Sequence, residues 1–232
     1  TLTRGDDEAA RQVELTRARI RLTSVRSEMI EPGYGYVAIA QCRQETVGEL
    51  RRRLSQLDRQ AGGLRGLVID LRGNPGGALD AAVDIADMFI AEGRIVSIEG
   101  RIAETRQRFD ARSGDAWERL PLAVLIDEGT ASAAEIIAAA LKAHGRAVLL
   151  GARSYGKGSV QNVFALDETH AVRLTTARYF TADGRSIQAE GVHPDIALGA
   201  YELGDATVDA PAMRVERDLP GHLAAMVEPE AD

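Results

Sequence analysis

Cysteine and aromatic residues are scarce in this chain of 232 residues. The one cysteine, Cys42, excludes a disulfide within the chain, and its apolar neighbours predict a buried packing role rather than a reactive thiol. Aromatic residues make up 4% of the sequence, so the core has to be built from alanine, valine, isoleucine and leucine. With 45% hydrophobic and 27% charged residues, the composition is that of a globular protein and not of a disordered one.

Long apolar runs and an excess of positive charge are also missing. The apolar run from Leu120 to Ile126 is far shorter than the ~20 residues that cross a bilayer. No signal peptide is visible, although a start at Thr1 rather than at a methionine leads us to expect a trimmed product and leaves an upstream export signal open. The net charge of -7 argues against a general nucleic-acid binder, which needs a basic face for phosphates.

Lysine is the rarest charged residue. Only Lys142 and Lys157 are lysines among the 28 basic residues, so wherever this chain needs a simple positive charge it uses arginine. Arginine cannot lose its proton in a protein, whereas lysine can be tuned to do so. A lysine flanked by glycines, as Lys157 is, therefore needs a chemical reason.

The hydrophobic pattern predicts an α/β fold with a largely parallel sheet, because strand-then-helix units dominate residues 35–150. Strands are predicted at 35–40, 67–71, 94–98, 122–126 and 147–150, with two more within 1–24 and a hairpin at 162–166 and 171–176. Helices are predicted at 46–60, 79–90 and 133–143, with a short one near 222–227. Residues 101–120 are predicted to be a polar surface excursion. In parallel sheets the chemistry gathers at the carboxyl ends of strands. The two most distinctive turns, 72–77 and 129–132, follow predicted strands.

Ser132 lies between a predicted strand and a helix rich in alanine. Free amide groups at a helix N-terminus favour an anion, which is one reason to consider this hydroxyl for chemistry. The simpler interpretation from the residues alone is a helix N-cap, since Glu135 three residues later completes a capping-box pattern.

Lys157 has two interpretations that need no catalysis. It fits a solvated lysine in a turn, and 151–157 also satisfies most of a phosphate-loop pattern. That pattern fails at Gly158, where a serine or threonine has to bind magnesium, and the next residues predict a strand rather than a helix. The four histidines show no metal-ligand spacing, and a Ser-His-Asp triad stays open because triads form in space.

The turn after the predicted strand 67–71 combines an ion pair with paired glycines. Asp70 and Arg72 are interpreted as an ion pair that shapes the turn. Gly76 and Gly77 permit unusual backbone angles and let a ligand approach main-chain N–H groups closely.

Together these residues resemble the C-terminal processing (tail-specific) peptidases, the Ser-Lys endopeptidases of family S41. The resemblance covers most of residues 25–230 and rests on the joint order and spacing of several blocks. The blocks are 70–77 (DLRGNPGG), 129–136 (GTASAAEI), 146–147 (RA), 154–161 (SYGKGSVQ), 179–184 (YFTADG) and 190–195 (EGVHPD). One departure is Ala134, where many relatives carry serine at a position that is not the nucleophile.

The resemblance assigns a role to each motif. It implies that Ser132 is the nucleophile, that Lys157 is the general base and that Gln161 orients the lysine. The family's oxyanion hole would map onto the main-chain N–H groups of Ala133 and Gly77, with Gly76 as the other candidate. No metal or nucleotide cofactor is implied.

Elementary acid–base chemistry agrees with these roles. A lysine has an ordinary pKa of ~10.4, and a useful general base needs ~7–8, so about 4 kcal/mol must favour the neutral amine. Burial supplies such a shift, and so does the absence of carboxylates from residues 151–161.

The resemblance also sets expectations for domains, partners and location. It implies a ClpP/crotonase-like peptidase S41 core at 25–232, preceded at 1–24 by remnant strands of an upstream PDZ domain that captures substrate tails. It implies protein or peptide substrates with exposed C-terminal tails in the periplasm or cell envelope, and leaves open an adaptor protein and a homo-oligomer. Two alternatives are a catalytically inactive ligand-binding or scaffolding module of the same fold and a nucleotide-binding phosphate-loop protein.

Overall fold

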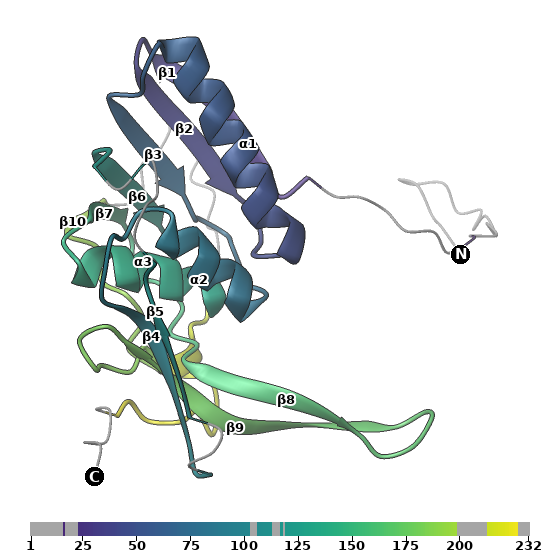
Figure 1. Ribbon diagram of the computed structural model, residues 1–232. Coiled ribbons are helices and arrows are strands. Elements are labelled where there is room, and N and C mark those ends of the chain that lie inside the picture. Colours follow the sequence, from purple (N-terminus) through teal and green to yellow (C-terminus); the bar gives the residue numbers. More distant parts are fainter. Residues whose placement is uncertain are drawn as a thin grey trace, which may run out of the picture.

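The computed structural model describes residues 16, 23–102, 106–112, 117, 119–198 and 213–226. They form one six-stranded and one four-stranded sheet (Figure 1). The elements are β1 (Val25–Glu31), β2 (Tyr34–Ile39), α1 (Gln44–Ala61), β3 (Gly66–Asp70), α2 (Leu79–Asp87), β4 (Arg94–Gly100), β5 (Gln107–Asp110), β6 (Leu122–Ile126), α3 (Ala133–Ala143), β7 (Ala147–Gly151), β8 (Ser159–Ala165), β9 (Ala171–Thr181), β10 (Ile196–Ala197) and a 3-10 turn at Glu216–Asp218. In this described part of the chain, every helix is too short or too polar to traverse a bilayer.

The six-stranded sheet has the order β1-β2-β3-β6-β7-β10. Only the β1–β2 pair is antiparallel, and the other four pairings are parallel. The predicted α/β fold with a largely parallel sheet is therefore confirmed. Because β3, β6 and β7 are parallel neighbours, the loops that follow them all emerge at one edge of the sheet.

Helix α1 covers one end of this sheet and packs on β1 and β2. Its apolar side chains recur at helical spacing, so Leu50, Leu54 and Leu57 share one buried face. The helix ends at Gly62, which adopts a left-handed conformation with φ of 66° and whose N–H caps the last turn. The predicted helix at 46–60 and its glycine stop are confirmed.

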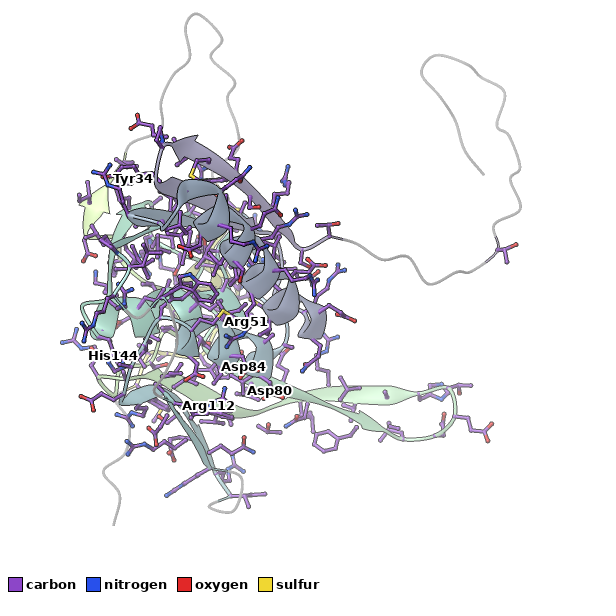
Figure 2. All side chains as sticks on the ribbon, turned by 45° about the horizontal axis from the view of Figure 1, so that its top comes forward. Tyr34, Arg51, Asp80, Asp84, Arg112 and His144 are labelled. Atoms are coloured by element: carbon purple, nitrogen blue, oxygen red, sulfur yellow. The ribbon has the colours of Figure 1, made fainter. Side chains whose placement is uncertain are left out.

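Helices α2 and α3 pack against each other, and both also contact β4 of the four-stranded sheet. Alanine lines much of both helices, and small side chains let the backbones approach closely enough to bury nearly every residue of α3. Outside this core, Arg112 reaches α2 and pairs with Asp84 at 2.7 Å and Asp87 at 2.9 Å (Figure 2).

The four-stranded sheet has the order β5-β4-β9-β8 and is antiparallel throughout. Strands β8 and β9 form the predicted hairpin, and both strands are longer than expected from the sequence. The two strands run past the end of β4 and project from the body as a two-stranded ribbon (Figure 1).

One expectation from the sequence is incomplete, one is wrong, and one concerns residues that the structure does not describe. The described residues of the stretch 101–120 lie mostly at the surface, as predicted, but they include strand β5, which is ordered by pairing with β4 rather than by a local pattern. No helix forms at 222–226, because Leu223 and Met226 are 37% and 48% exposed and so have no buried face to stabilise a helix. The strands expected within 1–24 fall almost wholly on residues that the structure does not describe.

Candidate active site

Three loops meet at the edge of the sheet where β3, β6 and β7 end. The turn 71–77 follows β3, residues 127–132 lead from β6 into α3, and residues 152–158 follow β7. Main-chain hydrogen bonds join them in sequence. The N–H of Ala131 donates to the carbonyl of Asn74 at 2.9 Å, and the N–H of Tyr155 donates to that of Thr130 at 2.9 Å. The loops thus form one connected framework.

Asn74 holds the first loop in place from inside the protein. Its fully buried side chain donates to the carbonyl of Ile39 at 2.8 Å and accepts the N–H of Gly76 at 2.8 Å. An asparagine that satisfies both a strand carbonyl and its own turn fixes the backbone of the Pro-Gly-Gly segment.

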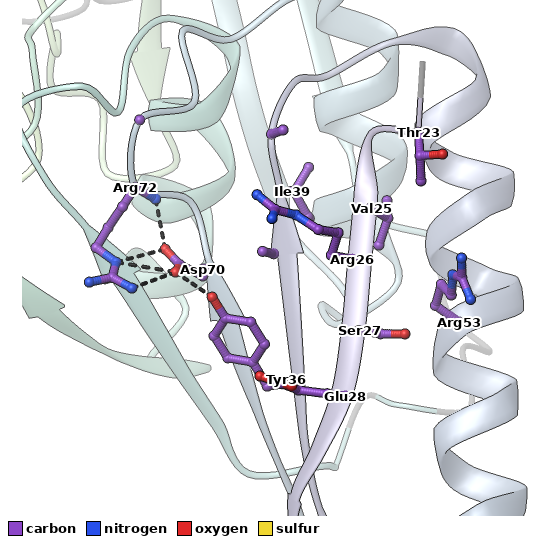
Figure 3. A pocket seen from close by; sticks show the side chains of 13 residues that line it. Thr23, Val25, Arg26, Ser27, Glu28, Tyr36, Ile39, Arg53, Asp70 and Arg72 are labelled. Carbon is purple, nitrogen blue, oxygen red and sulfur yellow. Dashed lines mark hydrogen bonds and ion pairs between the residues drawn. The ribbon is translucent and has the colours of Figure 1, made fainter. Parts of the chain in front are cut away.

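Asp70 and Arg72 flank this turn as an ion pair, as predicted. Arg72 contacts the Asp70 carboxylate at 2.7 Å, and the hydroxyl of Tyr36 donates to the same carboxylate at 2.6 Å (Figure 3). Burial alone would raise the pKa of Asp70, but hydrogen bonds from Arg72 and Tyr36 hold it below its usual value. The network forms one wall of a surface pocket of about 740 Å³ between β1, β2 and this turn.

Ser132 occupies the position just before α3 with an unusual backbone. Its φ of 55° and ψ of -119° lie outside the regions that L-residues prefer. Such a conformation costs about 1–3 kcal/mol and persists only where the surroundings enforce it. The sequence predicted an N-cap, and the structure confirms the position while adding a strain that no capping role requires.

The carboxylate of Glu135 is the centre of the site. Its Oε2 accepts the main-chain N–H of Ser132 at 2.8 Å and that of Lys157 at 2.8 Å. Both nitrogens lie at that distance from one oxygen, so they can be no more than twice that distance apart. Its Oε1 accepts the N–H of Gly156 at 2.7 Å and the hydroxyl of Ser154 at 2.5 Å. One side chain therefore joins the loop after β6 to the loop after β7.

Glu135 is fully buried, and this burial governs its acidity. Desolvation raises the pKa of its carboxyl to about 7, and the four hydrogen bonds oppose the shift only in part. The expectation that no carboxylate lies near Lys157 is therefore wrong. It considered only residues 151–161, whereas Glu135 reaches the lysine from 22 positions earlier in the chain.

The main chains of Ser132 and Lys157 are close together, but the predicted catalytic side chains do not hydrogen-bond to one another. Among the described residues, no hydrogen bond joins the Ser132 hydroxyl to the Lys157 amine or involves the Gln161 side chain. Gln161 is exposed. It follows a shift in the β8–β9 register: Val160 lies opposite Ala177 and Gln161 opposite Thr175, so Thr176 has no residue opposite it in β8.

Main-chain hydrogen bonding distinguishes Gly76 from Gly77, the two glycine candidates for the oxyanion hole. The N–H of Gly76 is already bonded to Asn74. Gly77 contacts the Cys42 backbone so closely that a Cβ on it would overlap the Cys42 carbonyl oxygen. Within the described part of the chain, the N–H groups of Gly77 and Ala133 donate to no protein acceptor. These two N–H groups, rather than that of Gly76, are available to an anion.

Cys42 supports the turn from inside the core. Its side chain is buried, and burial raises the pKa of its thiol to about 12. Its main-chain N–H donates to the carbonyl of Gly76 at 2.9 Å, and its carbonyl accepts the N–H of Ala78 at 2.7 Å. The predicted packing role is therefore confirmed.

Comparisons with known proteins place this chain among peptidases. A family model described as Peptidase family S41 matches residues 33–198. A Carboxy-terminal-processing protease of Bartonella bacilliformis is 39% identical over 223 residues, which cover 93% of this chain and 50% of that protein. A chloroplastic C-terminal processing peptidase of Tetradesmus obliquus is 34% identical over 201 residues, covering 81% and 43%.

Solved structures show the same likeness. A photosystem II D1 C-terminal processing protease superimposes with a TM-score of 0.68 and 32% sequence identity over 79% of this chain and 50% of that one. The chain thus spans about half the length of the proteins that it matches.

The strain at Ser132 predicts that glycine stabilises this position. Ser132→Gly should raise the free energy of unfolding by about 1 kcal/mol relative to Ser132→Ala, because glycine adopts positive φ without a steric penalty. Urea unfolding of the two variants measures the difference. An alanine variant at least as stable as the glycine variant would show that the backbone here is unstrained.

The buried Glu135 predicts a pH-dependent stability. Because its folded pKa of about 7 exceeds the ordinary 4.5, its contribution to the free energy of unfolding is fully present below pH 4.5 and is lost as pH rises through 7. Glu135→Gln provides a reference that does not titrate. The stability of the wild type relative to this variant should fall by about 2–3 kcal/mol between pH 5 and pH 8. Urea unfolding at both pH values tests this, and an unchanged difference would contradict it.

Proposed function

Since the chain belongs to peptidase family S41, we propose that it is a serine endopeptidase in which Ser132 is the nucleophile and Lys157 the general base. The observation that carries the proposal is the shared Glu135 oxygen, which accepts the N–H groups of both residues. This bridge supports a dyad because it fixes the two backbones next to each other on separate loops.

The proposed reaction follows from the chemistry of the two side chains. The neutral amine of Lys157 takes the proton of the Ser132 hydroxyl, and the serine oxygen attacks the carbonyl carbon of a peptide bond. The tetrahedral intermediate collapses when the protonated lysine gives its proton to the leaving amine. Water then hydrolyses the acyl-enzyme, with the same lysine accepting the proton of water.

The negative charge of the tetrahedral intermediate needs donors that are already in place. We assign this role to the N–H groups of Ala133 and Gly77, because neither donates to a protein acceptor in the described structure. Gly76 is less suited, since its N–H is bonded to Asn74. One such donor contributes about 3–4 kcal/mol to stabilising a transition state.

We assign Gln161 to orienting the Lys157 amine, as the family resemblance implies. It follows Lys157 by four residues on the strand that begins directly after the loop. The exposed side chain and the register shift beside it support a position that is completed when substrate binds. Hydrogen bonds between catalytic groups are often long in unliganded enzymes, so the present geometry is compatible with this role.

The proposed substrates are unfolded proteins or proteins with exposed C-terminal tails. Relatives of this chain carry the names carboxy-terminal-processing protease and C-terminal processing peptidase, and these names support the proposal. We propose that residues 25–232 form the peptidase core and that the protein acts in the periplasm or cell envelope.

The two lysines of the chain offer a matched test of the dyad. Ser132→Ala and Lys157→Ala should each lower cleavage of a reduced and alkylated protein by at least about a thousandfold, since each removes a reacting group. Lys157→Arg should be equally inactive, because a guanidinium does not deprotonate. Lys142→Ala, which removes an exposed ion pair with Asp195, should cleave normally. Full activity in either Ser132→Ala or Lys157→Ala would end the proposal.

Gln161 should act more weakly than the dyad. Gln161→Ala should reduce kcat by about 10-fold to 100-fold, because it positions the base without exchanging a proton. Asn162→Ala, which removes only a hydrogen bond to Thr176, is the neighbouring control. Steady-state cleavage rates compare the two variants, and equal rates would remove Gln161 from the site.

A further inference from the structure

The ribbon formed by β8 and β9 has a free edge that begins at the site. Strand β8 is the last strand of its sheet, and no described strand pairs with its outer side. It starts at Ser159, two residues after Lys157, and leads away from the body along the ribbon (Figure 1). A strand of this length offers an edge of about 20 Å.

The hydrogen-bond register shows which main-chain groups face outward. The N–H of Leu166 donates to the carbonyl of His170, so these two residues form a hydrogen-bonded pair. Pairs alternate along an antiparallel ladder, so Phe164 and Val172 are bonded to each other, whereas Val163 and Arg173 are not. The N–H and carbonyl of Val163 therefore point away from β9, and the same holds for Gln161 and Ala165.

The composition of this edge is unusual for a strand without a partner. Proteins protect exposed edges with charged residues, proline or short strands. Residues 159–165 (SVQNVFA) contain neither a charge nor a proline, and Val163 and Phe164 are 62% and 46% exposed. The opposite edge of the same ribbon carries Arg173. The edge that starts at the site therefore has no charged side chain to keep another strand away.

We propose that the β8 edge binds the substrate polypeptide as an added β-strand, with outward main-chain groups of Gln161, Val163 and Ala165 pairing to its backbone. This proposal rests on the endopeptidase function above and specifies how the substrate is held. An unfolded chain carries unpaired N–H and carbonyl groups, which an edge recognises without regard to sequence. The exposed apolar side chains of the ribbon favour apolar stretches of substrate.

Continuity with the site favours substrate over a second copy of the chain. An extended peptide on β8 passes Gln161 and leads directly to the loop that holds Lys157. A second copy paired along the same edge would block that path. The two occupants make different predictions, because only a second copy changes the oligomeric state.

Proline tests the edge without breaking the hairpin. Val163→Pro removes an outward N–H and places a ring on the open edge, while the ladder to β9 keeps all its bonds. It should lower kcat/KM for a reduced and alkylated protein by about tenfold, chiefly through KM. Arg173→Pro makes the same change at the opposite edge and should cleave as the wild type does. Val163→Ala, which keeps the N–H, separates the backbone contribution from that of the side chain.

Labelling by a small fluorophosphonate probe separates this proposal from the proposed function. The probe reacts with Ser132 and does not reach β8, so Val163→Pro should be labelled at the wild-type rate. Normal cleavage by Val163→Pro, or an equal loss in Arg173→Pro, would overturn the edge proposal alone. A wild type that is neither labelled nor active would overturn both proposals.

Hydrogen exchange gives a measurement that needs no variant of the ribbon. In Ser132→Ala, adding the reduced and alkylated protein should slow exchange at the amides of Val163 and Ala165 but not at Arg173. Protection that appears instead on raising the concentration of Ser132→Ala alone, with a doubled mass in solution, would show pairing between copies and overturn the proposal.

Discussion

The site depends on one buried carboxylate. Glu135 lies in the first turn of α3 and accepts hydrogen bonds from two loops that belong to different strand ends. Burying a carboxylate is costly, and here four donors compensate in part for the water that it loses. Their positions are therefore coupled: none can move away without leaving the carboxylate short of a donor. The loop carrying Ser132 and the loop carrying Lys157 behave as one unit for this reason.

That coupling also explains how an unfavourable backbone at Ser132 is maintained. Its N–H is fixed by Glu135, and its carbonyl accepts the N–H groups of Glu135 and Ile136. Gly76 lies so close that a Cβ there would be 2.9 Å from the Cβ of Ser132, which leaves no room to relax. The N–H group of the next residue, Ala133, donates to no protein acceptor in the described structure.

Local patterns in the sequence predicted most of the fold, and family resemblance predicted the candidate residues. Helical spacing in α1 and the apolar runs of β3 and β6 are properties of neighbouring residues, so they could be read directly. Strand β5 was missed, because it is ordered by pairing with β4. Glu135 was interpreted as half of a capping box. Its carboxylate accepts the main-chain N–H of Ser132, which fits that interpretation. The same carboxylate also accepts the N–H groups of Gly156 and Lys157, and these contacts between distant segments leave no local pattern in the sequence.

The division between fixed and free groups suggests how such a site avoids uncontrolled cleavage. Several groups that shape the backbone are already bonded: Asn74 to the Gly76 turn, Glu135 to both loops, and Gly158 to Gln188 at 3.0 Å. In contrast, the Gln161 side chain and the outer edge of β8 have no hydrogen-bond partner among the described residues. In the proposed mechanism a substrate strand on that edge would lie beside Gln161 and lead to the loop that carries Lys157, so pairing with the edge would deliver the chain to the dyad. A folded protein without a free strand could not pair with the edge, which would confine cleavage to unfolded chains and exposed tails.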